Sequence, residues 1–196
     1  MQTYNLRNGR SLFPFFVMSV IYCHKLYELF RSAMFNLGIL TSSDAGSSGK
    51  REDTSGLFIK ELFSGKGFSV VRYEIVPDDI ATIENKITSW ADGGEVNLII
   101  TNGGTGLGPR DVVPEATKNV IERMVPGISE AMRQHGSNYT KLAMISRGVS
   151  GIRNNCLIIN LPGSLKAVKQ CLEAIEDVIP HALEVLTKIR VEEHPS

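Results

Sequence analysis

Cysteine is scarce in this chain of 196 residues. The three that occur, Cys23, Cys156 and Cys171, are an odd and widely spaced set without a CxxC pair. This usage argues against a disulfide framework and favours a reducing compartment, so we expect a cytoplasmic protein. The four histidines show no ligand spacing with the cysteines, which argues against a structural zinc site.

The chain also lacks an excess of basic residues, with 21 Lys plus Arg against 21 Asp plus Glu. Residues 1–36 hold four basic residues and one acidic residue, so the remainder carries 17 basic and 20 acidic residues. Nucleic-acid binding needs a basic stripe, and the main part of the chain offers none. We therefore expect no nucleic-acid partner.

No apolar run is long enough to span a membrane. Residues 12–23 are apolar for about 12 residues, whereas a spanning helix needs about 20. Arg7 and Arg10 precede this run as in a signal peptide, but no small-x-small cleavage site follows promptly. We interpret residues 1–36 as a poorly ordered or artefactual extension, with Met34 as an internal start. An organelle-targeting or membrane-contact segment is the alternative.

Two familiar nucleotide-binding fingerprints are missing as well. A G-x-G-x-x-G motif starting at Gly104 would need glycine where the chain has Pro109. The GSSGK segment at residues 46–50 has two residues between its glycines and is followed by Arg51, whereas a P-loop needs four residues and a Ser or Thr. A bound nucleotide must be held in another way.

What is present is a regular alternation of apolar and helical patterns from residue 37 onwards. The expected strands cover residues 37–41, 68–76, 96–100, 141–146 and 155–160. The expected helices cover about residues 54–64, 77–90, 114–134 with an interruption at Pro126-Gly127, 165–176 and 180–189. This order predicts a single Rossmann-like three-layer α/β domain at residues 37–190, with a mostly parallel sheet and a short tail at 191–196.

Residues 96–117 are the most informative segment, because an apolar strand leads directly into a glycine loop. Glycines let the backbone take positive φ and approach a ligand closely, leaving N–H groups for an anion. Thr105 adds a hydroxyl, Arg110 a fixed positive fork, and Asp111 a carboxylate that can hold Mg²⁺ or orient a nucleophile. The alternative is a glycine-rich turn with a solvent-facing ion pair.

Polar loops follow four of the expected strands, at residues 42–53, 77–79, 102–111 and 161–164. In an open α/β sheet, ligands bind at the carboxyl ends of the strands near a reversal of strand order. Because parallel strands end at the same edge, we expect these four loops to converge on one ligand site.

Each loop also has a purely structural interpretation. Asp78 could cap a helix, and Pro162-Gly163 could be a tight turn. Asp44 could be a solvated loop residue, and Ser146-Arg147 could bind a phosphate or cap a strand edge. We expect convergence of the loops to favour the ligand site.

Five blocks, in this order and spacing, resemble the MogA/MoaB-type molybdenum cofactor proteins, and most closely the G domain of gephyrin. They are LGILTSSD at 37–44, VPDD at 76–79, TNGGTGLGPRDVVPEAT at 101–117, SRGVSGIR at 146–153 and LIINLPGS at 157–164. Asn102 departs from the threonine of many relatives, an exchange we expect to be tolerated.

The resemblance implies a molybdopterin adenylyltransferase, a homotrimer that transfers AMP from Mg-ATP to the phosphate of molybdopterin and releases pyrophosphate. By motif, its acidic functional positions fall on Asp78 and Asp111, which we also expect to bind Mg²⁺. The loop and turn that bind the pterin phosphate and nucleotide fall on Gly103, Gly104, Thr105, Gly106, Pro162, Gly163 and Ser164. The candidate binding set is completed by Asp44, Arg110, Ser146 and Arg147.

No molybdenum-inserting E domain follows in the sequence, so we expect metal insertion to need a separate E-domain protein. The main alternative is a molybdopterin-binding or scaffolding module without catalysis. Intact Asp78 and Asp111 beside an intact GGTG loop count against it. A nucleotide-binding enzyme of another pathway is disfavoured because both fingerprints are absent.

Overall fold

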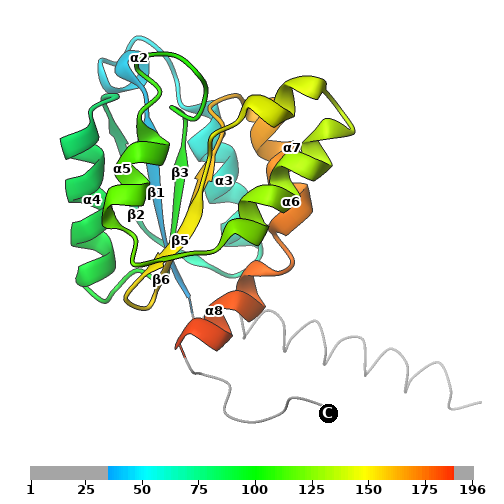
Figure 1. The fold of residues 1–196 in the computed structure, drawn as a ribbon. Helices are drawn as coiled ribbons and strands as arrows, with labels where there is room; N and C mark the ends of the chain where they lie inside the picture. The colour runs from blue at the N-terminus through cyan, green and yellow to red at the C-terminus, as the bar shows by residue number, and fades with distance from the viewer. Residues whose placement is uncertain (1–34, 188–196) are drawn as a thin grey trace, which may run out of the picture.

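Six strands form one sheet in the part of the chain that the computed structural model describes, residues 35–187 (Figure 1). Their order across the sheet is β2-β1-β3-β6-β5-β4. The strands are β1 (Asn36–Ser42), β2 (Ser69–Val76), β3 (Leu98–Asn102), β4 (Arg123–Met124), β5 (Ser150–Arg153) and β6 (Cys156–Leu161). The first four strands in the order, β2, β1, β3 and β6, are parallel, whereas β5 is antiparallel to both of its neighbours. The sheet is thus mostly parallel, as predicted.

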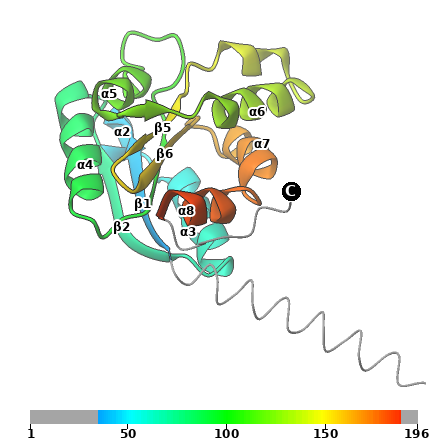
Figure 2. The same cartoon turned by 60° about the horizontal axis from the view of Figure 1, so that its bottom comes forward.

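Helices cover both faces of this sheet (Figures 1 and 2). They are α2 (Asp44–Ser47), α3 (Thr54–Gly65), α4 (Ile80–Asp92), α5 (Val113–Val120), α6 (Pro126–Ser137), the 3₁₀ helix η1 (Lys141–Ile145), α7 (Leu165–Ile175) and α8 (Ile179–Thr187). Helices α4 and α5 pack on one face, and α3, α6, α7 and α8 contribute to the core on the other. The predicted three-layer α/β domain is confirmed.

The central strand β3 shows why the sheet lies between two helical layers. Leu98 and Ile100 belong to one hydrophobic core and Ile99 to the other, and all three are fully buried. Successive side chains of a strand point to opposite faces, so an unbroken apolar run suits a strand covered on both sides. Burial of each such side chain stabilises the fold by about 1.5–3 kcal/mol.

Two expected elements are wrong. Residues 141–146, expected as a strand, form the 3₁₀ helix η1, in which Leu142, Met144 and Ile145 are exposed. Thr140 begins this turn because its hydroxyl accepts a hydrogen bond from Leu142 N at 3.3 Å. Pro126, expected to interrupt one helix, instead occupies the first turn of α6. Proline is tolerated there because a backbone N–H at this position would have no partner within the helix.

Two boundaries also differ from expectation. Strand β3 begins two residues later than predicted and ends at Asn102, directly before the glycine loop. Strand β1 begins at Asn36, one residue earlier than predicted, and Phe35 before it is also buried in the core. The interpretation of residues 1–34 and of the tail at 191–196 lies outside the described residues. None of the helices described between residues 35 and 187 has the length and apolar character needed to cross a membrane.

Candidate active site at the carboxyl edge of the sheet

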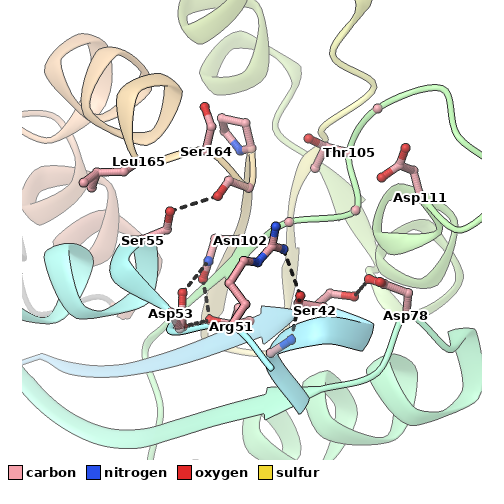
Figure 3. Close-up of a pocket in the computed structure, with 18 of the residues that line it drawn as sticks. Ser42, Arg51, Asp53, Ser55, Asp78, Asn102, Thr105, Asp111, Ser164 and Leu165 are labelled. Atoms are coloured by element: carbon pink, nitrogen blue, oxygen red, sulfur yellow. Dashed lines mark hydrogen bonds between the residues drawn. The ribbon is translucent and has the colours of Figure 1, made fainter. Parts of the chain in front are cut away.

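A cavity of about 640 Å³, here called the polar pocket, lies at the carboxyl ends of the parallel strands (Figure 3). Strand β2 pairs with one side of β1 and strand β3 with the other, so strand order reverses at β1. All four loops predicted to converge contribute to its lining, with residues between 42 and 55, Asp78, residues from 102 to 111, and residues 162–164. The four loops therefore meet in one cleft at this edge of the sheet.

The glycine loop after β3 takes a backbone path that larger residues resist. Gly103 and Gly104 have φ of 97° and 57°, in the left-handed region. A Cβ atom on Gly103 would lie 2.2 Å from the carbonyl oxygen of Ser42, which is a backbone atom and cannot move aside cheaply. Glycine is therefore required where this loop passes over the end of β1.

Asp78 faces the polar pocket and does not cap a helix. Its neighbour Asp79 caps α4, with Thr82 N donating to Asp79 Oδ1 at 2.9 Å. Asp78 instead accepts hydrogen bonds from Ser42 Oγ at 2.6 Å and from Asp44 N at 3.0 Å. These two donors fix the Asp78 carboxylate against the loop that follows β1.

Asp111 lines the same pocket from the far end of the glycine loop (Figure 3). Gly108 N donates to Asp111 Oδ2 at 2.8 Å. A Cβ atom on Gly106 or Gly108 would lie only 2.9 or 2.8 Å from that oxygen, so the two glycines leave room for the carboxylate. Among the described residues, none donates to Asp111 Oδ1, which leaves that oxygen available for a ligand.

Arg110 and Asp44 form an exposed ion pair, and neither residue lines the polar pocket. Arg110 Nε and Nη2 donate to the two Asp44 oxygens at 3.1 and 2.9 Å. The pKa of the Asp44 carboxyl is below its ordinary value. The main cause is the hydrogen bond from the Arg110 guanidinium, and the second is the hydrogen bond from Asp78 N. This ion pair links the glycine loop to the segment after β1, and it is not a pair within the glycine-rich turn.

Arg147 is not part of the pocket lining, whereas its neighbour Ser146 is. Arg147 Nε donates to Gly106 O at 2.6 Å, and its two terminal nitrogens donate to Asp111 O and Glu115 Oε1. Its backbone N–H donates to Thr105 O at 2.9 Å. The guanidinium is therefore engaged in holding the glycine loop.

The turn at Pro162, Gly163 and Ser164 packs against the glycine loop and begins α7. A Cβ atom on Gly163 would lie 3.3 Å from Gly103 Cα, so the two loops touch backbone to backbone. Ser164 caps α7 by accepting a bond from Ala167 N at 3.3 Å, and Ser55 Oγ donates to Gly163 O at 2.9 Å. The turn is both a helix start and a wall of the pocket.

Asp53 is a pocket residue that the sequence analysis did not select. It caps α3 by accepting a hydrogen bond from Gly56 N at 2.8 Å. Tyr73 OH donates to it at 2.9 Å, and Thr41 Oγ1 also lies within hydrogen-bonding distance. Burial and this carboxylate raise the pKa of the Tyr73 hydroxyl. The position of Asp53 directly before a helical pattern was the sequence signal that could have identified it as a helix cap.

Arg51 and Asn102 also line the pocket without having been selected as site residues. Arg51 Nη2 donates to Ser43 Oγ at 3.1 Å, which places its guanidinium at the cavity. Asn102 lies at the end of β3, with Oδ1 2.8 Å from Thr41 Oγ1. In the view of Figure 3, Asp53 and Ser55 lie on one side of the pocket and Asp78 and Asp111 on the other.

Asp78 and Asp111 line the polar pocket from different loops, and their carboxylates are candidate ligands for a metal ion. Within residues 35–187 no group of three or more His, Cys, Asp or Glu side chains could hold a metal. Mg²⁺ typically takes one or two protein carboxylates and completes its shell with water and substrate phosphates. Asp78 and Asp111, at the same pocket on different loops, fit that pattern.

Comparison with known proteins agrees with this site. The family described as "probable molybdopterin binding domain" matches residues 38–181. A molybdopterin adenylyltransferase from Helicobacter pylori strain J99 is 41% identical over 153 residues, which are 77% of this chain and 87% of that protein. Gephyrin from Dictyostelium discoideum is 40% identical over 160 residues, 76% of this chain but 22% of gephyrin.

The crystal structure of the molybdopterin biosynthesis enzyme MoaB from Thermus thermophilus superposes with a TM-score of 0.75. It is 49% identical, and the match covers 79% of this chain and 97% of MoaB. Sequence family, relatives and fold thus agree over the same part of the chain. This chain belongs to the molybdopterin-binding domain family.

Proposed function

We propose that this chain is a molybdopterin adenylyltransferase of molybdenum cofactor biosynthesis, which joins AMP from ATP to the phosphate of molybdopterin. The relative from H. pylori carries that name and matches over most of both chains. The observation that carries the proposal is the polar pocket, where Asp78 and Asp111 border a glycine loop with left-handed backbone. ATP and molybdopterin are accordingly its two substrates.

The reaction calls for positioning more than for a reactive side chain. An oxygen of the pterin phosphate attacks the α-phosphorus of ATP, the bond between the α- and β-phosphates breaks, and pyrophosphate leaves. A phosphate monoester has a second pKa of about 6, so the attacking oxygen is already largely ionised at pH 7. The protein must bring two polyanions together and neutralise their charge.

The pocket offers groups for each of these tasks. The backbone N–H groups of residues 103–106 and the turn at residues 162–164 are placed to bind phosphate oxygens. Asp78 and Asp111 would hold Mg²⁺ on the triphosphate. When bound, the ion supplies neutralisation of the charge that gathers on the leaving pyrophosphate. Thr105 and Ser146, which also line the cavity, add hydroxyl donors.

Three residues predicted from the sequence to contact ligand have a different role in this proposal. The side chains of Asp44 and Arg110 bind each other, and the Arg147 side chain binds the glycine loop and Glu115 of α5. We assign them to positioning the glycine loop, and thereby Asp111. Direct phosphate contact by either arginine would require these bonds to break.

The wider setting of the enzyme is also part of the proposal. We infer a homotrimer in the cytoplasm whose product passes to a molybdenum-inserting E domain. Light scattering on the full chain tests the assembly, and a monomer would contradict the trimer.

The activity is tested by incubating the full chain with molybdopterin and Mg-ATP and analysing the products by mass spectrometry. Adenylylated molybdopterin is the expected product, and omission of Mg²⁺ should abolish it. Tight binding of molybdopterin without any adenylylated product would identify a non-catalytic binding module instead.

A further inference from the structure

Arg51 is the only basic side chain among the described residues that line the polar pocket. Four acidic residues share the lining, namely Glu52, Asp53, Asp78 and Asp111. Carboxylates repel the phosphates of a substrate, whereas a guanidinium attracts them. Arg51 is therefore the side chain of the lining whose charge favours a phosphate-bearing ligand.

The guanidinium of Arg51 is less engaged than those of the two other arginines near the glycine loop. Arg110 donates twice to the carboxylate of Asp44, and Arg147 donates to three oxygens in the glycine loop and α5. Arg51 makes a single side-chain hydrogen bond, from Nη2 to Ser43 Oγ, and forms no ion pair with any residue between 35 and 187. Because a guanidinium carries five N–H donors, most of them stay available for a ligand.

The hydrogen bond to Ser43 fixes the place of this guanidinium. Ser43 is buried at the end of β1, and its hydroxyl also accepts a hydrogen bond from Gly46 N at 3.1 Å. In Figure 3, the Arg51 side chain lies in the middle of the pocket, with Asp53 on one side and Asp78 on the other. Arg51 is nevertheless an exposed residue, so a ligand that enters the cavity can reach its free donors.

We infer that Arg51 binds a substrate phosphate in the polar pocket. This inference rests on the proposed function, in which both substrates carry phosphate. A guanidinium presents parallel N–H donors that match two phosphate oxygens, and it stays charged throughout the physiological pH range. Its charge also offsets part of the repulsion between the carboxylates of the lining and a polyanion. The chemistry is the same for a phosphate of ATP and for that of molybdopterin, and the experiment separates the two sources.

The test measures equilibrium binding to the full chain of probes that differ only in phosphate. One pair is Mg-ATP and adenosine, and the other is an oxidised, fluorescent pterin with and without a phosphate on its side chain. Arg51→Gln removes the charge, so at least one phosphate-bearing probe should bind about tenfold more weakly, with a larger loss at low salt. Affinity for the two phosphate-free probes should stay within about twofold of the wild type.

Two further variants separate charge from shape. Arg51→Lys restores the charge without the planar fork, so it should recover part of the lost affinity. Lys50→Gln is the matched control for removal of one positive charge, because Lys50 is the exposed neighbour of Arg51 and does not line the pocket. This control should bind all four probes as the wild type does. Melting curves of the variants establish that their folds are intact.

The pattern of losses identifies the phosphate or overturns the inference. A loss for Mg-ATP would assign Arg51 to the triphosphate, and a loss for the phosphorylated pterin would assign it to the molybdopterin phosphate. Unchanged affinities in Arg51→Gln would overturn the inference and leave the proposed function intact. An equal loss for probes with and without phosphate would show that Arg51 only supports its loop through Ser43, which also overturns it. Failure of the wild type to bind either phosphate-bearing probe would contradict the proposed function itself, and the inference with it.

Discussion

The polar pocket shares one wall with a second cavity of about 350 Å³ between α6, η1 and α7, here called the apolar pocket. The two pockets are made from different kinds of structure. The polar pocket is formed mainly by loops that follow parallel strands, and it presents backbone groups and carboxylates such as Asp78 and Asp111. The apolar pocket is formed largely by side chains of α6, η1 and α7. The sheet edge thus supplies polar and charged groups, while the helical layer supplies an apolar surface of defined shape.

Substitution of Asp111 should have the largest effect on this division. Asp111→Asn keeps the shape of the polar pocket but removes a charge, so we expect AMP transfer to fall on the order of 100-fold or more. Molybdopterin should still bind, because the exchange leaves the shape of the polar pocket unchanged. Asp177→Asn, on an 87% exposed side chain, is the control. Unchanged turnover in Asp111→Asn would remove the metal-binding role from the account.

Gly103 tests whether the polar pocket depends on its backbone path. Gly103→Ala must adopt left-handed φ and places a Cβ atom against Ser42 O, so we expect a loss of about 2 kcal/mol or more in unfolding free energy. Gly127→Ala is the control, because no atom lies within 4 Å of its added Cβ. Urea unfolding measures both. Equal stability of the two variants would show that the loop can rearrange at little cost.

Substitution of Arg147 distinguishes a role in positioning the glycine loop from direct ligand binding. Arg147→Lys keeps the charge but cannot reach Gly106 O, Asp111 O and Glu115 together, so we expect kcat to fall about tenfold with little change in KM. Steady-state kinetics of AMP transfer gives both constants. A raised KM for molybdopterin with unchanged kcat would restore the phosphate-binding role predicted from the sequence.

The smallest effect is expected at the exposed pair of Asp44 and Arg110. The lowered pKa of Asp44 means that the pair stabilises the fold above the ordinary carboxyl pKa of about 3.9, and that this contribution is lost as pH falls through the lowered value. In Arg110→Gln, NMR titration should show the Asp44 pKa moving towards ~3.9. Loss of Mg-ATP binding in this variant would instead assign Arg110 to phosphate.

The sheet could be predicted from the sequence because its strands are short apolar runs between polar loops. Ile99 and Ile100 are buried on opposite faces, as expected for an apolar run in a parallel strand that helices cover on both sides. The segment 141–146 misled the prediction because its apolar side chains, including Leu142 and Met144, lie exposed on a 3₁₀ turn. An apolar run alone does not distinguish these two outcomes.

Parts of the site were predictable to different degrees. Convergence of the loops on Asp78 and Asp111 followed from parallel topology. The partners of the two arginines did not, because Arg147 and Gly106 lie 41 residues apart and only the fold brings them together. The apolar pocket could not be predicted from the sequence for the same reason, because residues from α6, η1 and α7 together form its wall.

The central claim is tested most directly by the stoichiometry of one turnover. Limiting molybdopterin is mixed with excess enzyme and Mg-ATP, and pyrophosphate and adenylylated pterin are measured together. We predict one pyrophosphate and one adenylylated pterin for each molybdopterin consumed, with neither formed when molybdopterin is omitted. Pyrophosphate release without adenylylated pterin, or no pyrophosphate despite bound molybdopterin, would contradict the assignment as an adenylyltransferase.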